Sequence, residues 1–205
     1  MNLASRIAIA TLGAIAASAG SGALAQQTGN PAVADPQTPR VRTGRPPAEF
    51  PNTPDIIFMQ QAAIGGSAEV QIGKLAQQRA QSEAVKSYAE RMVKDNETAN
   101  DKLAPLLRSN KVEAPKDLDP EHKAARDELQ KLEGSRFDVR YIEGQIKAHQ
   151  KTVQLLIHEV GAGQDARVKS YAAETLPVVM RHLEMARSIH AQLTTAPDAK
   201  STAGN

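Results

Sequence analysis

The sequence predicts an all-α protein, an antiparallel four-helix bundle with a short extra helix in its middle connection. Four long segments repeat apolar residues at the three- to four-residue period of an α-helix. Pro115 and Pro120 interrupt that period between the second and third segments, and Gly161 and Gly163 end the third. Each long segment also carries one polar residue at the centre of its apolar stripe. Bundles that hold a buried metal show this pattern of inward polar residues.

The first 25 residues have the three parts of a secretory signal peptide. Arg6 supplies the positive charge, residues 7–19 are apolar, and Ala23-Leu24-Ala25 is a small-x-small cleavage site. The apolar part is too short to span a bilayer. We therefore expect a periplasmic protein without a transmembrane segment after cleavage, with secretion or outer-membrane association as alternatives.

The remaining chain divides into a linker, one domain and a tail. Residues 26–54 are rich in proline, which forbids a continuous helix, and residues 194–205 are small and polar. We expect both segments to be disordered. Residues 55–193 then form the four-helix bundle domain, whose size is ordinary for a single domain.

The composition excludes several classes of chemistry. The chain has no cysteine, which removes disulfides, thiolate nucleophiles, Cys-ligated zinc and iron–sulfur clusters. The net charge is +2 and basic residues are not interleaved with aromatic ones, so we expect no nucleic-acid binding. Motifs for a catalytic nucleophile or a phosphate loop are missing. We assign no catalytic or cofactor-binding residues and lean towards a protein that is not an enzyme.

The first two long helices are expected over residues 55–80 and 82–108. Ser82 is a suitable N-cap for the second of them. The polar residues at the centres of their stripes are Glu69 and Asn96. Because these two residues lie nearly equally far from the turn between the helices, we expect them to face each other.

The second half of the bundle is expected to begin with the short helix, over residues 121–132. The two long helices that follow are expected over residues 135–160 and 165–193, with His149 and His182 at the centres of their stripes. These residues have similar expected positions along the bundle axis, which predicts one buried polar cluster in the bundle. Its expected members are Glu69, Asn96, Asp138, Tyr141, Gln145, His149 and His182.

A short internal repeat supports the arrangement in two hairpins. The motif Val-Lys-Ser-Tyr-Ala occurs at 85–89 and again at 168–172, each time preceded at the same distance by Val-Gln. Both copies follow an expected turn, so we predict two similar hairpins related by a pseudo-two-fold axis. The repeated tyrosines, Tyr88 and Tyr171, are expected at the bundle edges with their hydroxyls in water.

One interpretation of the polar centre is a metal site. Glu69, His149 and His182, helped by Asp138, would supply a two-His, one-carboxylate set suited to iron, manganese, zinc or copper. Ferritin-like di-iron sites need Glu-x-x-His on two helices, and no such motif lies on an inward face here. The other histidines are expected to be solvated. They are His122, His158 and His190.

The interpretation that we favour is a buried hydrogen-bond network, since buried polar groups must be paired. In this network Glu69 accepts a hydrogen bond from Asn96 or from a histidine, and Asp138 or Tyr141 orients His182. Such a network would determine the register of the bundle without a cofactor.

Short motifs spread over residues 55–193 match a known pattern when taken together. They are Glu69-Val70-x-Ile72-Gly73-Lys74-Leu75-Ala76, Met92-Val93-Lys94-Asp95, Phe137-Asp138-x-x-Tyr141-Ile142, His149-Gln150-Lys151 and Thr175-Leu176-Pro177-x-x-x-x-His182-Leu183. By these motifs the chain resembles domain of unknown function 4142, a bacterial envelope family with a ferritin-like four-helix fold. The resemblance implies an exported helical bundle whose biochemical role is unassigned.

The chain departs from that family at one position of the polar centre. The resemblance implies Asp-His where this chain has Asp95-Asn96, and an amide is a poor ligand for transition metals. We therefore expect a non-enzymatic structural, stress-related or binding protein of the cell envelope, with another envelope protein as a candidate partner. The alternative is a metal-binding ferritin-like protein with a buried carboxylate and histidine site that supports redox chemistry.

Overall fold

A computed structural model describes residues 50–114 and 116–195 of the protein, all within one compact unit. The predicted signal peptide, residues 26–49 of the predicted linker and residues 196–205 of the predicted tail lie outside the described residues. The described residues form five helices and no strand. These are α1 (Thr53–Arg79), α2 (Glu83–Ser109), α3 (Pro120–Leu129), α4 (Gly134–Ala162) and α5 (Ala166–Thr195). The prediction of an all-α four-helix bundle with a short extra helix is confirmed.

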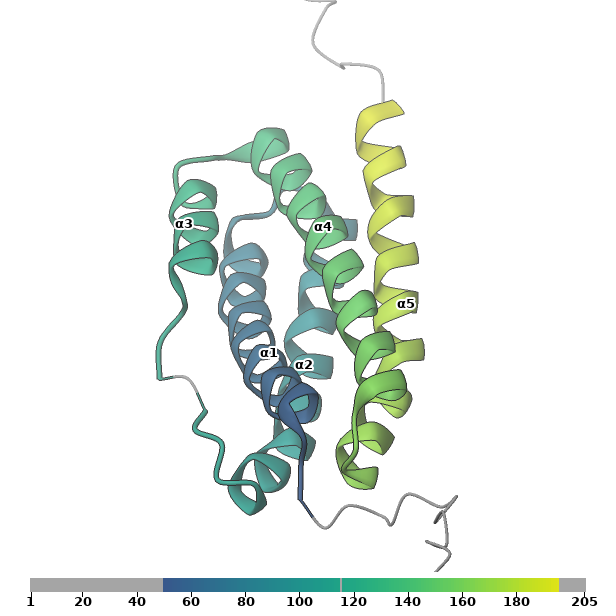
Figure 1. Ribbon diagram of the computed structural model, residues 1–205. Helices are drawn as coiled ribbons and strands as arrows, with labels where there is room; N and C mark the ends of the chain where they lie inside the picture. The colour runs from purple at the N-terminus through teal and green to yellow at the C-terminus, as the bar shows by residue number, and fades with distance from the viewer. Residues whose placement is uncertain (1–49, 115, 196–205) are drawn as a thin grey trace, which may run out of the picture. The chain divides into compact units, whose positions relative to one another are not determined.

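The bundle consists of two antiparallel hairpins (Figure 1). Helix α1 packs mainly on α2, and α4 packs mainly on α5. Contacts of α1 with α4, and of α2 with α5, join the two hairpins less closely. Helix α3 lies beside the bundle near the first half of α4 (Figure 1). None of the helices in the described ranges has the length and apolarity that a membrane crossing requires.

Local hydrogen bonds explain where the helices begin. Asn52 caps α1 in a capping box, because its Oδ1 accepts from the Asp55 amide at 3.0 Å and Asp55 accepts from the Asn52 amide at 2.7 Å. Asp119 caps α3 by accepting from the His122 amide at 2.8 Å. Ser82 stands at the N-cap of α2 as expected, but its side chain makes no capping bond.

Helix α4 ends later than its glycines predict. Gly161 lies inside the helix and only Gly163 caps it, with its amide donating to the Glu159 carbonyl at 2.8 Å. Helix α5 likewise continues through Thr195. Single glycines are tolerated inside helices that tertiary packing stabilises.

The apolar core is divided into two clusters at opposite ends of the bundle. The Tyr141 cluster comprises Ile72, Ala76, Ala80, Val85, Tyr88, Ala89, Met92, Leu129, Phe137, Tyr141, Ile142, Ala186 and Ile189. The Phe58 cluster comprises Phe58, Met59, Ala63, Leu103, Leu107, Leu156, Val168, Tyr171, Ala172 and Val179. Along each long helix, the predicted polar centre falls between the two clusters.

The two repeated tyrosines are buried, which corrects their expected position at the bundle edges. Tyr88 is 1% exposed in the Tyr141 cluster, and Tyr171 is 9% exposed in the Phe58 cluster. Their ring area is large and apolar, so burial inside the bundle outweighs the hydration of one hydroxyl. One copy of the repeat therefore contributes to each cluster.

Candidate ligand-binding site

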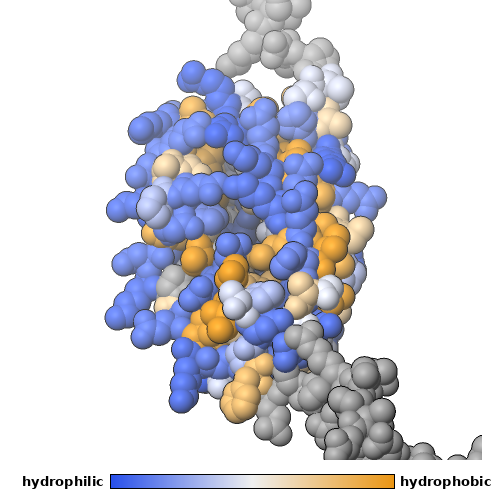
Figure 2. Space-filling view, in the orientation of Figure 1, coloured by the Kyte–Doolittle hydropathy of each residue, from blue (hydrophilic) through white to orange (hydrophobic). Residues whose placement is uncertain are grey.

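A cavity of about 760 Å³ lies between the two apolar clusters and is lined by residues from all five described helices. On the face drawn in Figure 2, a recess near the centre lies among hydrophilic side chains. Pockets that bind small molecules in proteins have volumes of roughly 300–1,000 Å³. The middle layer of the bundle is thus large enough to enclose a small ligand.

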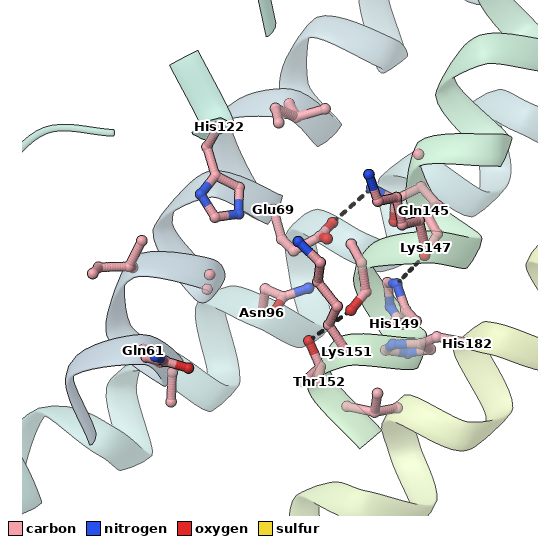
Figure 3. Close-up of a pocket in the computed structure, with 18 of the residues that line it drawn as sticks. Gln61, Glu69, Asn96, His122, Gln145, Lys147, His149, Lys151, Thr152 and His182 are labelled. Carbon is pink, nitrogen blue, oxygen red and sulfur yellow. Dashed lines mark hydrogen bonds between the residues drawn. The ribbon is translucent and has the colours of Figure 1, made fainter. Parts of the chain in front are cut away.

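Gln145 organises the polar wall of this cavity (Figure 3). Its side chain is buried, and its Nε2 donates to Glu69 Oε2 at 2.9 Å. Its Oε1 accepts a hydrogen bond from the Tyr88 hydroxyl at 3.3 Å. Because the carboxylate only accepts, these two bonds determine the orientation of the amide. Gln145 thereby holds Glu69, which is half-buried, in the cavity wall.

His149 is buried and its ring has a defined tautomer. Its Nδ1 lies 2.9 Å from the main-chain carbonyl oxygen of Gln145. A carbonyl can only accept, so Nδ1 carries the proton. In the neutral ring, Nε2 then has a free lone pair. His149 therefore adds a hydrogen-bond acceptor to the cavity wall.

His182 is held by a carboxylate. Its Nε2 lies 2.9 Å from Asp95 Oδ2, so Nε2 donates and Nδ1 keeps the lone pair of the neutral ring. Burial lowers the pKa of His182, and this effect exceeds the opposing hydrogen bond to Asp95. The ring is therefore neutral at pH 7. Its centroid lies 5.6 Å from that of His149, with the two rings at 72°.

The Tyr141 hydroxyl is buried in the cavity wall and has no hydrogen-bond partner among the described residues. Burial, followed by the nearby negative charge of Glu69, raises the pKa of Tyr141 well above its usual value. The same two causes raise the pKa of Tyr88. Both hydroxyls therefore keep their protons near neutral pH.

Asn96 lines the cavity, but it does not donate to Glu69. Its Nδ2 donates to the Met92 carbonyl one turn earlier in α2, at 2.9 Å. Short polar side chains often bond to their own helix in this way. Gln145 takes the place next to Glu69 that was expected for Asn96.

Asp138 does not line the cavity. Its two carboxylate oxygens accept from the amides of Gln81 at 3.0 Å and Ser82 at 2.7 Å. These amides belong to the turn between α1 and α2, whose backbone donors need partners once they are buried. The expectation that Asp138 or Tyr141 orients His182 is corrected, because Asp95 does so.

The three remaining histidines differ in their exposure and position. His158 is exposed, as expected. His122 is half-buried, with its Nδ1 2.9 Å from both Asp119 carboxylate oxygens. His190 is half-buried and lies 3.7 Å from Glu143. Only His122 of these three lines the cavity.

Two parts of the structure were not predicted from the sequence. Asp95 flanks its apolar stripe, and nothing in the sequence pairs it with His182, 87 positions away. Asp55, Glu159 and Asp165 are buried together where α1 begins and α4 ends. No helical period identifies such a group, because its members belong to three different chain segments.

The fit of a metal to this site is limited. In the part of the chain that the structure describes, no three His, Asp or Glu side chains are placed to hold a metal ion. His149 and His182 supply two free imidazole nitrogens by the tautomers above. Glu69 would have to be the third ligand, and its carboxylate already accepts from Gln145.

A family model described as domain of unknown function (DUF4142) matches residues 42–189. The chain belongs to this family. The match includes the whole of α1 to α4 and most of α5, so this DUF4142 protein carries its cavity within the family domain. The resemblance noted from the motifs is confirmed. A comparison with curated proteins gives no match.

A solved structure has a similar fold. It is the crystal structure of a DUF305 fragment from Deinococcus radiodurans, with a TM-score of 0.63 and 13% sequence identity. The similarity covers 70% of this chain and 99% of the other. At this sequence identity, the similarity shows only that the two proteins share a helical fold.

Proposed function

We propose that this protein is a non-enzymatic binding protein of the bacterial cell envelope that holds a small molecule in its central cavity. The observation that carries the proposal is the cavity of about 760 Å³ in the middle of the bundle. Its walls combine apolar side chains with a few convergent polar groups, as binding pockets do. The signal peptide predicted at residues 1–25 supports the envelope location.

The cavity wall offers little support for covalent catalysis. Its two threonine hydroxyls donate to carbonyls of their own helices, Thr152 to Ala148 at 3.0 Å and Thr175 to Tyr171 at 2.7 Å. Neither hydroxyl is paired with a histidine that would activate it as a nucleophile. These contacts favour binding over reaction.

Cavity filling tests the proposal. Native mass spectrometry of the mature protein, purified gently from the periplasm, should detect a bound small molecule. Gly65 and Gly144 line the cavity and have no atom within 4 Å of an added Cβ, so Gly65→Leu and Gly144→Leu should remove that molecule. Gly161→Leu is the matched control, because Gly161 is equally open but lies outside the cavity.

Retention of the same molecule in both cavity-filled variants would place its binding elsewhere on the protein. If neither a co-purified molecule nor any member of a metabolite library shifts the melting temperature, the binding proposal is wrong. A ligand present at about 100 times its Kd should add roughly 2.7 kcal/mol of stability.

A second candidate function is metal binding, which the orientation of two imidazoles favours. His149 donates through Nδ1 to a carbonyl, and His182 donates through Nε2 to a carboxylate. Histidines that ligate metals are oriented by such bonds. Glu69 would have to move to complete the set, because no three such side chains of the described residues are placed to hold a metal. Metal analysis by mass spectrometry after incubation with iron, manganese, zinc or copper tests this function.

A near-stoichiometric metal that is lost in both His149→Ala and Glu69→Ala would support the metal function. Under the same hypothesis, Asn96→His should raise the affinity by adding a ligand to the cavity wall. Metal content at background level in all these proteins would leave small-molecule binding as the function.

A further inference from the structure

We propose that the cavity recognises a primary amine with an apolar body, and that the ammonium group binds against Glu69, Tyr141 and His149. This inference rests on the proposed binding function and adds the chemical class of the ligand. It starts from three polar side chains that line the cavity, of which Figure 3 labels Glu69 and His149.

Glu69 differs from the other carboxylates that line the cavity. Each of the others contacts a side chain with a basic nitrogen, which is neutral in His182 and charged in Lys151 and Arg140. The pairs are Asp95–His182 at 2.9 Å, Asp119–His122 at 2.9 Å, Glu121–Lys151 at 2.6 Å and Glu128–Arg140 at 2.7 Å. Glu69 accepts only from the neutral Gln145 amide among the described residues. A half-buried carboxylate without a cation is left to be neutralised by a ligand.

Two more acceptors lie in the same part of the wall. In the neutral ring of His149, Nε2 carries the lone pair, because Nδ1 is bound to the Gln145 carbonyl, and no bond to this Nε2 is found among the described residues. The Tyr141 hydroxyl is buried without a partner among the described residues, and its oxygen can accept. Tyr88 lies near both residues. Its ring centroid is 6.2 Å from that of Tyr141 and 6.5 Å from that of His149.

An ammonium group fits these acceptors better than other head groups do. It has three donors and no acceptor, and it carries a positive charge, whereas Glu69 forms no ion pair among the described residues. A carboxylate or phosphate would be repelled by Glu69. A neutral hydroxyl would use the hydrogen bonds but would leave the charge unpaired, and charge-assisted bonds are about twice as strong as neutral ones.

The rest of the cavity suits an apolar body. Apolar side chains extend the wall from the polar groups into the Phe58 cluster. They include Phe58, Leu155, Leu156 and Val179. A linear alkyl chain that begins at Glu69 would thus displace water from apolar surface, which favours binding.

Isothermal titration calorimetry of the mature protein at pH 7.5 with chelator tests the ligand class. The probes are hexylamine, hexanol and hexanoate, which share one chain and differ in head group. We expect hexylamine to bind about tenfold more tightly than hexanol, and hexanoate more weakly than both. Glu69→Gln should abolish the preference for the amine and leave the affinity for hexanol unchanged. Glu90→Gln, which changes an exposed glutamate outside the cavity, is the control.

Equal affinities of the amine and the alcohol would overturn the amine assignment while the binding function stands. Preferential binding of hexanoate would overturn it as well. If none of the probes binds, the amine assignment is wrong, and the co-purified molecule of the cavity-filling experiment decides the binding function independently. The comparison of probes on the unmodified protein requires no variant to fold.

Discussion

At the scale of single residues, Glu159 is the most unusual side chain of the bundle. It has no exposed surface, and neither carboxylate oxygen has a donor among the described residues. Its carboxyl group occupies the space where a Cβ of Gly163 would lie. Burial, followed by the hydrogen bond to Asp55, raises the pKa of Glu159 from 4.5 to about 8. Glu159 is therefore protonated near neutral pH.

Asp55 is the neighbour of Glu159 in this group and is bonded to main-chain amides. It accepts from the amides of Asn52 at 2.7 Å, Gln164 at 3.0 Å and Asp165 at 3.2 Å. Amide donors stabilise the charged form of a carboxylate. These bonds join the start of α1 to the turn between α4 and α5.

The raised pKa predicts that stability falls as the pH rises. A group whose pKa is higher in the folded state contributes its full stabilisation below its unfolded pKa, here about 4.5, and loses it as the pH rises through about 8. Asp55 and Asp165 oppose ionisation of Glu159, while Lys169 favours it. We expect the melting temperature, measured by circular dichroism, to fall between pH 5 and pH 9.

Glu159→Gln should flatten this decrease, because the amide cannot ionise and is close to the acid in shape. Glu184→Gln, at an exposed position, should keep the slope of the unmodified protein. Identical slopes in all three proteins would show that Glu159 does not hold a proton.

Tyr88 and Tyr141 differ in what their hydroxyls do. The Tyr88 hydroxyl donates to Gln145, whereas the Tyr141 hydroxyl has no partner among the described residues. Tyr88→Phe should cost about 1 kcal/mol in the free energy of unfolding, because a buried amide oxygen loses its donor. Tyr141→Phe should cost nothing or stabilise the protein, because it removes an unpaired buried hydroxyl. Urea unfolding measures both, and an equal cost would contradict this assignment.

At the scale of elements, the turn between α1 and α2 depends on a residue of α4. Asp138 accepts the amides of Gln81 and Ser82, while the Ser82 side chain makes no cap. Asp138→Ala should cost about 2–3 kcal/mol, since it leaves two backbone donors without a charged acceptor. Chemical denaturation measures the cost, and Asp101→Ala at an exposed position is the control. A cost no larger than that of the control would mean that the turn needs no support from α4.

The contact between α1 and α2 is close enough to require a glycine. A Cβ at Gly73 would lie 2.8 Å from Val93 Cγ2, and a valine side chain in a helix has little rotamer freedom. Gly73→Ala should therefore destabilise the protein by roughly 1–3 kcal/mol. Gly161→Ala, where no atom lies within 4 Å, should instead stabilise α4 by about 0.5–1 kcal/mol. Thermal unfolding that gives both changes the same sign would contradict this explanation.

At the scale of the whole bundle, a polar layer with a cavity separates two apolar clusters. The Tyr141 cluster and the Phe58 cluster bury the large side chains at the two ends. The middle layer keeps polar side chains and free volume instead. A protein under selection for stability alone would fill such a layer, because empty volume costs packing energy. The binding function that we propose is therefore assigned to this layer.

Much of this architecture could be predicted because it depends on local periodicity. An apolar residue every three or four positions makes a helix bury one face, wherever its neighbours lie. The four long helices and the inward positions of Glu69, His149 and His182 follow from that rule. The predicted end of α4 was less accurate, because packing stabilises the helix beyond Gly161.

The sequence by itself thus determined the class of fold, the number of long helices and the face on which the polar residues lie. Only the tertiary structure decided their partners: Gln145 for Glu69, Asp95 for His182, the α1–α2 turn for Asp138 and Asp55 for Glu159. The physical reason is that a hydrogen bond requires heavy atoms within about 3 Å. A period of 3.6 residues specifies a face of a helix, but the axial position and rotation of one helix against another depend on packing over the whole core.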